Sequence, residues 1–425
     1  MSATYEVVVI GAGPGGMAAA TVAAEAGLKV CLIDNNSTAG GQIWRGVRPD
    51  TAQKAVHGSS YARWNERLDR ARCTVVCGSE VVAAPGAGAL SLENEWGCHE
   101  VRYDRLILAT GARERFLPFP GWTLPGVMGA GGMQALLKSG MKAGGKRVVV
   151  AGTGPLLLAV AAGATKAGAR VISVHEQATL GKLAGFGLQV ALSAPGKLLE
   201  GAAYRWQTRS AGFRLGSWVV RAEGGERLEQ VVVTDGSHEE RIACDWLACG
   251  FHLVPNLELP QLLGCRVEGG FVAVDEMQQS SVAGVACVGE LTGVGGLEKA
   301  LVEGEIAGWA AAGRTDKVRA LGARRRAGVR FAARLESAFA LRPELRGLAD
   351  RTTVVCRCED VTHGALAECK SGREARLHTR CGMGACQARV CGSATEFLYG
   401  WQPTSGRPPV FPARVETLLG ASAER

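Results

Sequence analysis

Glycine spacing near the N-terminus constrains the fold more than any other feature of this chain. A short apolar segment, residues 6–10, runs directly into Gly11, Gly13 and Gly16, and an alanine-rich segment follows. In such a turn the first glycine allows a tight bend, the second lets backbone N–H groups approach a pyrophosphate, and the third lets the helix pack closely on the strand. Asp34 ends the next apolar segment, where a carboxylate can accept hydrogen bonds from a ribose. The pattern predicts a βαβ unit that binds a dinucleotide, with its phosphates at the positive end of the helix.

Three further segments, far apart in the sequence, indicate that this dinucleotide is FAD. The first follows Asp34 closely, as does the loop that runs beside the cofactor in flavoproteins. The second ends a returning apolar strand in a glycine turn. The third follows another apolar segment and carries an acid where the ribityl chain or the pyrophosphate would pass. In this order the candidate residues are Gly41 and Gln42, Thr110 and Gly111, and Gly289 and Glu290.

A second glycine turn begins a second βαβ unit but departs from the first. Gly152 and Gly154 follow an apolar strand, whereas Leu157 occupies the third glycine position. Glu176, at the end of the next strand, can still hold a ribose, and no arginine follows it closely to clamp a 2′-phosphate. NADPH is therefore disfavoured, and the site remains open between NAD, ATP or another adenine nucleotide, and no nucleotide. The uncharged window 148–165 imitates a membrane span, but its Gly-x-Gly turn predicts a buried strand, turn and helix.

Six of the fourteen cysteines lie in a short stretch near the C-terminus. A Cys-x-Cys pair places two thiolates within reach of one metal centre, and a second pair in a glycine-containing loop can complete a four-thiolate cage around iron. The order therefore indicates an iron–sulfur cluster, through which electrons would leave one at a time. Four thiolates also suit a structural Zn²⁺, which stays open as the alternative. The six are Cys356, Cys358, Cys369, Cys381, Cys386 and Cys391.

The length and charge of the chain bound the remaining possibilities. With 425 residues it exceeds the size of a single hydrophobic core, so two or three domains are expected. The net charge of +8 comes without a basic patch interleaved with aromatic side chains, which argues against nucleic acid binding and favours an acidic partner at least as well. The first residues carry no basic, signal-like segment. We therefore expect reduced thiols and a cytoplasmic protein without a transmembrane segment, with peripheral association at the inner face of the cell membrane as an alternative.

The two glycine turns and the segments between them resemble the flavoprotein superfamily of thioredoxin and nitrite reductases, over about residues 5–315. The order agrees, with an FAD half, an inserted nucleotide domain and a return through residues 248–256. The second domain lacks the Cys-x-x-Cys of thioredoxin reductase, so that disulfide cannot shuttle electrons here. The segments 356–362 and 379–391 resemble the bacterioferritin-associated-ferredoxin-like (BFD-like) [2Fe–2S] module. The whole chain is similar to the α subunits of heteromeric dye-linked amine dehydrogenases, a group with opine oxidases, hydrogen cyanide synthase, and the D-hydroxyproline and L-proline dehydrogenases.

This resemblance implies a fold class, a domain order and a ligand set. The fold is expected to be α/β, with two Rossmann-like dinucleotide-binding domains of the glutathione/thioredoxin reductase kind and a small helical BFD-like [2Fe–2S] domain. Relatives of the module carry a non-cysteine residue where Cys381 stands, so the implied ligands are Cys356, Cys358, Cys386 and Cys391. Cys381 in place of one of the last two stays the alternative, and Cys369 is expected to be a packing residue. The expected domains are 1–118 and 251–318 for FAD, 119–250 for the second nucleotide, 319–351 as a basic linker or helix, 352–400 for the cluster, and 401–425 as a Pro-rich tail.

The resemblance also implies a function in electron transfer within a larger complex. A β subunit similar to D-amino-acid oxidase would oxidise an amino acid or opine, with FMN at the contact between the two polypeptides. A small ferredoxin-like γ subunit would be a further partner. This chain would pass the electrons to a quinone or another acceptor. It needs no catalytic residue of its own, and its seven histidines are scattered rather than grouped with a nucleophile. A self-contained NADH-dependent FAD/[2Fe–2S] reductase and a zinc-bearing scaffold are the competing hypotheses.

Overall fold

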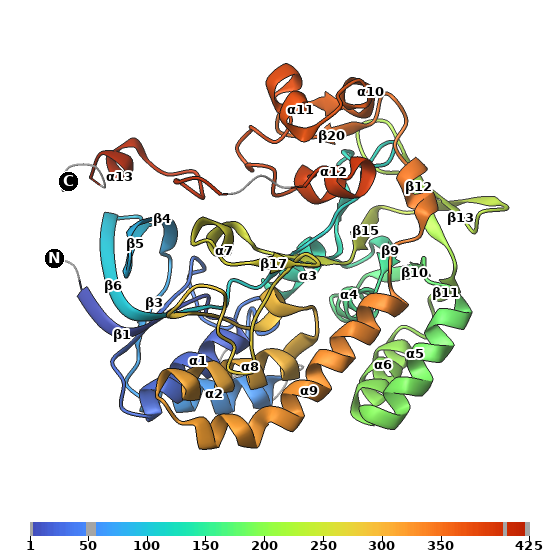
Figure 1. Ribbon diagram of the computed structural model, residues 1–425. Helices are drawn as coiled ribbons and strands as arrows, with labels where there is room; N and C mark the ends of the chain where they lie inside the picture. Colours follow the sequence, from blue (N-terminus) through green and yellow to red (C-terminus); the bar gives the residue numbers. More distant parts are fainter. Residues whose placement is uncertain (1–2, 48–56, 403–405, 421–425) are drawn as a thin grey trace. The chain divides into compact units, whose positions relative to one another are not determined.

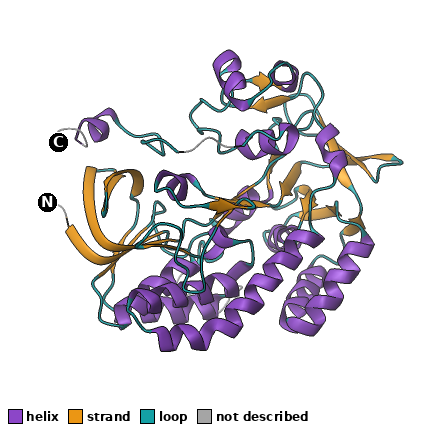
Figure 2. Cartoon of the chain, viewed as in Figure 1, coloured by secondary structure: helices purple, strands orange, loops and turns teal. Residues whose placement is uncertain are grey.

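The computed structural model describes residues 3–47, 57–402 and 406–420 (Figures 1 and 2). The chain divides into two compact units. The first comprises residues 1–113, 255–333 and 405–425, and the second comprises residues 114–254 and 334–404. The chain passes between them within the short strands β7 (Ala112–Glu114) and β16 (Leu253–Pro255), and again within helix α9 (Thr315–Ala338). The predicted α/β class is confirmed, with the second nucleotide fold inserted into the first.

A seven-stranded sheet forms the centre of the first unit, in the order β3-β2-β1-β6-β5-β4 with β19 also paired to β6. Alternate residues of β1 enter the cores on the two faces of this sheet, Val7 and Val9 on one side and Val8 and Ile10 on the other. Burial of both faces explains why the strand reads as a continuous apolar run. The strands of this sheet are β1 (Ala3–Ile10), β2 (Val30–Ile33), β3 (Thr74–Val76), β4 (Glu80–Gly86), β5 (Ala89–Asn94), β6 (Gly97–Leu108) and β19 (Val285–Cys287). A separate two-stranded sheet is formed by β17 (Val267–Glu268) and β18 (Phe271–Val272).

Two helices of the first unit, far apart in the sequence, pack closely together. A Cβ on Gly304 of α8 would lie 2.1 Å from Gly15 O of α1, so only glycine permits this approach of the backbones. Residues 406–420 of the Pro-rich tail also belong to this unit, where Val410 N donates to Val82 O at 2.9 Å. The helices are α1 (Pro14–Glu25), α2 (Gly58–Arg70), α7 (Glu258–Leu262), α8 (Gly296–Ala311) and α13 (Val415–Gly420).

The second unit contains a parallel sheet in the order β11-β10-β9-β15-β8 and an antiparallel sheet in the order β12-β13-β14. The window 148–165 forms strand β9 and helix α4, as predicted. Across the described residues, every helix is too short or too polar to span a bilayer. The elements are β8 (Val127–Gly129), α3 (Ala130–Lys138), β9 (Arg147–Thr153), α4 (Leu156–Lys166), β10 (Arg170–Glu176), α5 (Leu180–Ser193), α6 (Pro195–Gln207), β11 (Gly212–Leu215), β12 (Trp218–Glu223), β13 (Gln230–Thr234), β14 (Glu239–Ala243) and β15 (Trp246–Phe251).

The cysteine-rich segment also belongs to the second unit. It is tied to the rest of that unit by Trp122 Nε1, which donates to Val354 O at 2.6 Å, and by Leu345 and Leu348, which enter the core around Trp218. The segment has its own small core of buried side chains, several of them cysteines. Its elements are β20 (Val354–Cys356), β21 (Val361–Thr362), α10 (His363–Ala367), α11 (Gly372–Thr379) and α12 (Cys391–Tyr399).

Candidate cofactor sites

The first glycine turn joins β1 to α1 and has the close contacts that its spacing predicted. Gly11 has a φ of +100°, and a Cβ there would lie 2.3 Å from Ala109 O. A Cβ on Gly16 would lie 1.8 Å from Gly11 O. Both contacts are with backbone atoms, which cannot move aside without distorting the strand and helix. Larger residues are therefore excluded at both positions.

Gly13 lies beside open space rather than beside a neighbour. The nearest atom to a Cβ on Gly13 would be Gly41 Cα at 4.0 Å, and Gly13 itself is only partly buried. Gly41 approaches from the loop after β2 with a φ of +57°. The turn leads into α1, whose N-terminus carries the positive end of the helix dipole. This cradle fits a pyrophosphate, as expected for a bound dinucleotide.

Asp34 holds the end of β2 against this turn. Its Oδ2 accepts a hydrogen bond from Ala12 N at 2.5 Å, and its Oδ1 accepts from Asn36 N and Nδ2, each at 2.7 Å. Arg45 then donates to Asn36 Oδ1 at 2.9 Å and to Gln42 Oε1 at 3.1 Å. The predicted Asp34 and Gln42 thus belong to one polar network. Asn36 and Arg45 were missed by the sequence analysis, although the tandem asparagines after Asp34 were a signal.

Thr110 and Gly111 are fixed by Asn256, where the chain returns to the first unit. Thr110 Oγ1 donates to Asn256 O at 3.0 Å, and Asn256 Nδ2 donates back to Thr110 O at 2.7 Å. Asn256 N donates to Gly111 O at 3.0 Å. Arg113 Nη1 completes the set by donating to Asn256 Oδ1 at 2.8 Å. The structure therefore joins the two predicted residues to a segment that follows them by more than a hundred positions.

Gly289 and Glu290 lie in a 3₁₀ turn, Gly289–Thr292, after β19. Of the apolar segment before Gly289, only Val285–Cys287 forms a strand, which pairs with β6. The Glu290 carboxylate accepts hydrogen bonds from the N–H groups of Gly295 and Gly296, at 3.1 and 3.0 Å. It therefore organises the loop that precedes α8.

A buried ion pair that the sequence analysis missed holds the peptide at Gly289. Lys299 Nζ and Glu303 Oε2 are 2.8 Å apart, and each side chain is 2% exposed. Glu303 Oε2 accepts from Gly289 N at 2.9 Å, and Lys299 Nζ donates to Gly289 O at 2.9 Å. Thr292 Oγ1 bonds both groups at 2.8 Å. The Lys-x-x-x-Glu spacing that follows the glycines at 293, 295 and 296 was the available signal in the sequence, but such spacing is usual on exposed helices.

The second glycine turn differs from the first in being covered by its own unit. Gly152 and Gly154 are buried, whereas Gly11 and Gly13 are partly exposed. Glu176 is also buried, and its carboxylate is occupied by Gly154 N at 2.7 Å, Thr153 Oγ1 at 2.8 Å and Ala178 N at 2.9 Å. Burial raises the pKa of Glu176 to about 7. The predicted residues are therefore together, but their polar groups bond to one another.

The covering segment follows helix α9. Gln177 Nε2 donates to Ala340 O at 3.3 Å, and Gln177 Oε1 accepts from Arg342 N at 3.2 Å. The Phe339 side chain, 5% exposed, packs edge-on against Phe186 of α5 with 5.5 Å between ring centroids. Phe339 O accepts from Thr153 Oγ1 at 3.4 Å. A nucleotide entering this turn would have to displace these contacts.

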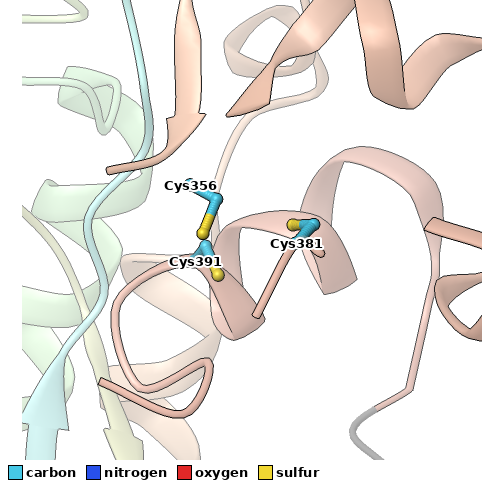
Figure 3. Close-up of side chains that lie close together, drawn as sticks. All are labelled: Cys356, Cys381 and Cys391. Carbon is cyan, nitrogen blue, oxygen red and sulfur yellow. The ribbon is translucent and has the colours of Figure 1, made fainter. Parts of the chain in front are cut away.

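Five of the six C-terminal cysteines gather in two adjacent groups. Cys356, Cys381 and Cys391 are buried, with their Sγ atoms all within 4.8 Å of one another (Figure 3). Hydrogen bonds from the thiols of Cys381 and Cys391 hold the pKa of Cys356 well below its ordinary value. Gly382 N also donates to Cys356 Sγ at 3.5 Å. Several sulfur donors close together and an N–H···S hydrogen bond are features that suit an iron–sulfur centre.

The second group is the pair Cys358 and Cys386. The backbone N–H of Cys386 donates to the Cys358 sulfur, and the Cys358 thiol donates to the Cys386 sulfur. This pair is more exposed than the first group. Glycine at 384 is required here, because a Cβ would lie 2.4 Å from Cys358 Cβ. Cys369 is set apart and packs against the small core of the segment, with its thiol bonded to Ala365 O at 3.6 Å. The donor set of clustered thiols therefore fits a thiolate-held metal centre.

Comparison with known proteins agrees with this architecture. Residues 5–315 match the pyridine nucleotide-disulphide oxidoreductase family. One of the subunits of opine oxidase from Rhizobium meliloti is 35% identical over 91% of this chain and 90% of its own length. Hydrogen cyanide synthase subunit HcnB of Pseudomonas aeruginosa is 34% identical over 90% of each chain. The solved structure of L-proline dehydrogenase from P. horikoshii superposes with a TM-score of 0.72 at 17% identity, covering 98% of this chain and 80% of that one, which shows a shared fold.

The family model spans both glycine turns, and the two curated relatives match about nine-tenths of this chain. Membership implies FAD binding, which the open cradle at Gly13 and Gly41 fits. The relatives are named as subunits, so partner subunits are expected for this chain too. The chain is an oxidoreductase that belongs to the pyridine nucleotide-disulphide oxidoreductase family and is homologous to subunits of opine oxidase and hydrogen cyanide synthase.

Proposed function

We propose that this chain is the electron-transfer subunit of a heteromeric dehydrogenase that oxidises CH–NH or CH–NH₂ groups of an amino acid or opine. The observation that carries the proposal is the grouping of five cysteines in a chain that also has an open FAD cradle. A thiol cluster in the same chain as a flavin fold suits the transfer of single electrons, which a hydride-transfer enzyme does not need. The name of the opine oxidase subunit supports an amino acid or opine as the class of donor.

Separate sets of residues would bind the two cofactors. When bound, FAD exchanges electron pairs or single electrons, and a [2Fe–2S] cluster carries single electrons. Gly11, Gly16 and Gly41 allow the close backbone contacts of the turn, and Gly13 leaves room for the FAD pyrophosphate. Asp34 holds the turn in shape through its hydrogen bond from Ala12 N. For the cluster we propose the ligands Cys356, Cys358, Cys386 and Cys391, two from each group, with Cys381 as a buried neighbour. The N–H of Gly382 stabilises negative charge on the Cys356 sulfur.

The substrate would be oxidised on another polypeptide. We propose a β subunit resembling D-amino-acid oxidase, with FMN where the two polypeptides meet, a small ferredoxin-like γ subunit, and a quinone or similar acceptor. In this assignment no side chain of the present chain acts as a base on the substrate. Proline, hydroxyproline, an opine and glycine are all compatible donors.

The covered second turn separates this proposal from a self-contained NADH-dependent reductase. Such a reductase needs NADH to reach Gly154 and Glu176, whose polar groups bond to each other beneath the segment around Phe339. Reduction of the flavin should therefore follow addition of amine to the complex and not addition of NADH to the chain.

Anaerobic purification with the β subunit tests the proposal. We expect a yellow-brown complex with stoichiometric FAD, iron and acid-labile sulfide, and bleaching of its visible absorbance within seconds of adding the amine substrate. Addition of NADH to the isolated chain should leave the flavin oxidised over the same time. A chain that contains zinc without iron, that is bleached by NADH, or that dehydrogenates an amine at full rate alone would contradict the proposal.

A further inference from the structure

Two helices of the second unit expose large apolar side chains. Leu180, Leu188 and Leu192 of α5 are 69%, 67% and 82% exposed, and Leu199 and Trp206 of α6 are 72% and 69% exposed. The two helices pack against each other as a hairpin (Figure 1). Single exposed leucines are normal on a protein surface, but five large side chains on one hairpin mark an interaction site.

The apolar side chains follow helical spacing. Leu180, Ala184, Leu188 and Leu192 recur every four residues, so they form one stripe along α5. On α6, exposed Leu199, Ala203 and Trp206 have the spacing of a second stripe. The sequence therefore places an amphipathic pattern on these helices, with the apolar side facing outward.

The opposite side of α5 is held by contacts of its own. Phe186 packs on Phe339, and Val190 is buried. Arg334 Nη1 donates to Ser193 Oγ at 2.8 Å and to Gln189 O at 3.4 Å. Because the helix is fixed on this side, the leucine stripe does not belong to the core of its own unit. It is unpartnered within the described residues.

Open backbone along α5 adds to the apolar stripe. Gly181, Gly185 and Gly187 have no atom within 4 Å of the position that a Cβ would take. Small residues of this kind let a partner helix approach the backbone closely. Together with the leucines they provide both apolar area and shape for a packed contact.

The charges on the hairpin show what kind of partner fits. Over residues 180–209 there are four cations, Lys182, Lys197, Arg205 and Arg209, and one acid, Glu200, which gives a net charge of +3. Three of the four cations lie on or just after α6, so the leucine stripe of α5 is nearly free of charge. A charge-depleted centre with a basic border matches a protein partner that has an apolar groove and an acidic rim.

Two other occupants fit less well. A helix that lies on a membrane has a strongly charged polar side, whereas α5 carries a single charge, Lys182. A second copy of this chain would bring two borders of the same positive sign together, which costs free energy. The relatives, in contrast, are named as subunits of enzymes.

We infer that the exposed face of α5 and α6 is the docking surface for the catalytic β subunit. The inference rests on the proposed function, because it assumes that such a subunit exists. The leucines and Trp206 would fill an apolar groove of the partner, and the basic border would meet acidic side chains around that groove.

Co-expression of the tagged full-length chain with the D-amino-acid-oxidase-like β subunit tests this assignment. Leu192→Glu places a charge at the most exposed leucine of the face, and Trp96→Glu makes the same change at a side chain 79% exposed in the turn between β5 and β6. We expect wild type and Trp96→Glu to retain the β subunit equally, and Leu192→Glu to bind it at least tenfold more weakly. Flavin and iron contents equal to wild type would show that Leu192→Glu is folded.

Other binding results would contradict either the docking surface or the proposed function. Retention of the β subunit by Leu192→Glu with wild-type affinity would refute the docking surface while leaving the proposed function intact. Failure of wild type to bind the β subunit would refute the proposed function. Sedimentation of wild type, but not Leu192→Glu, with phosphatidylglycerol/phosphatidylcholine vesicles would assign the face to a membrane, and a wild-type homodimer lost in Leu192→Glu would assign it to a second copy. Either result would refute the inference.

Discussion

The buried pair Lys299–Glu303 makes the strongest prediction about stability. Both side chains are 2% exposed, and together they grip the Gly289 peptide from its N–H and C=O sides. Removing one member of a buried ion pair leaves the other charge without compensation, which costs about 3–5 kcal/mol. Lys299→Met should lower the free energy of unfolding by about 3 kcal/mol, the lower end of this range, because Glu303 still accepts hydrogen bonds from Gly289 N and Thr292 Oγ1.

Glu303→Leu should lower the free energy of unfolding by more than Lys299→Met does. It leaves the Lys299 ammonium with only the neutral acceptors Gly289 O and Thr292 Oγ1. In the double variant neither charge is buried, so its cost should be smaller than the sum of the two single costs by more than about 1 kcal/mol. Because Gly289 shifts in each single variant, FAD retention should fall in parallel.

Denaturant unfolding provides the measurement. Tryptophan fluorescence and flavin release should be followed on the same samples, since a chain with two units can unfold in more than one step. Single variants within about 0.5 kcal/mol of wild type would refute the reasoning, because that is the range of ordinary surface substitutions. Costs that simply add in the double variant would show that the two charges do not interact.

Three further predictions follow from local geometry. Gly41→Ala should lower the FAD content severalfold, because the new Cβ would lie 2.8 Å from the backbone of the glycine turn. Gly78→Ala, which is also at a positive φ but in open space, should keep its FAD. FAD loss in both variants would show that backbone conformation, and not the contact with the turn, is the cause. Metal analysis should show that Cys381→Ala retains iron and that Cys356→Ser loses it. Iron loss in both variants would contradict the proposed ligand set and would make Cys381 a ligand. Burial raises the pKa of Glu114 from 4.5 to about 7, so its ionisation opposes folding, and unfolding free energy should fall as pH rises through this window. Glu114→Gln should make the fall in unfolding free energy between pH 5 and pH 8 smaller, and the part that remains is expected from Glu176, whose pKa is also raised to about 7. An unchanged fall would exclude Glu114 as a contributor.

Local spacing in the sequence was sufficient for the parts of the fold that depend on local chemistry. The glycines at 11, 13 and 16 predicted the strand-turn-helix, because each has a steric reason that needs no knowledge of the rest of the chain. The apolar window 148–165 was assigned to a buried strand and helix for the same reason. The cysteine spacing likewise predicted a grouping of thiols, although which four of them hold a metal is still a prediction.

Contacts between segments that are far apart in the sequence could not be predicted from local patterns. Lys299 and Glu303 look like an exposed helical pair until the fold buries them around Gly289. Glu176 kept the position of a ribose-binding acid, yet the segment at Phe339, more than a hundred and fifty residues later, covers the turn it serves. The leucines of α5 look like core residues by their period, and only the placement of Phe186 and Arg334 turns them outward.

The sequence by itself determined that this chain forms two glycine turns, each between a strand and a helix, and a thiol-rich segment, because glycine sterics and cysteine spacing act over a few neighbouring residues. Only the tertiary structure decided which turn is open, which charges are buried and which apolar face is left exposed. These properties depend on segments that come together only after folding. Burial sets the free energies of the charged and apolar groups, and no local pattern in the sequence shows which groups will be buried.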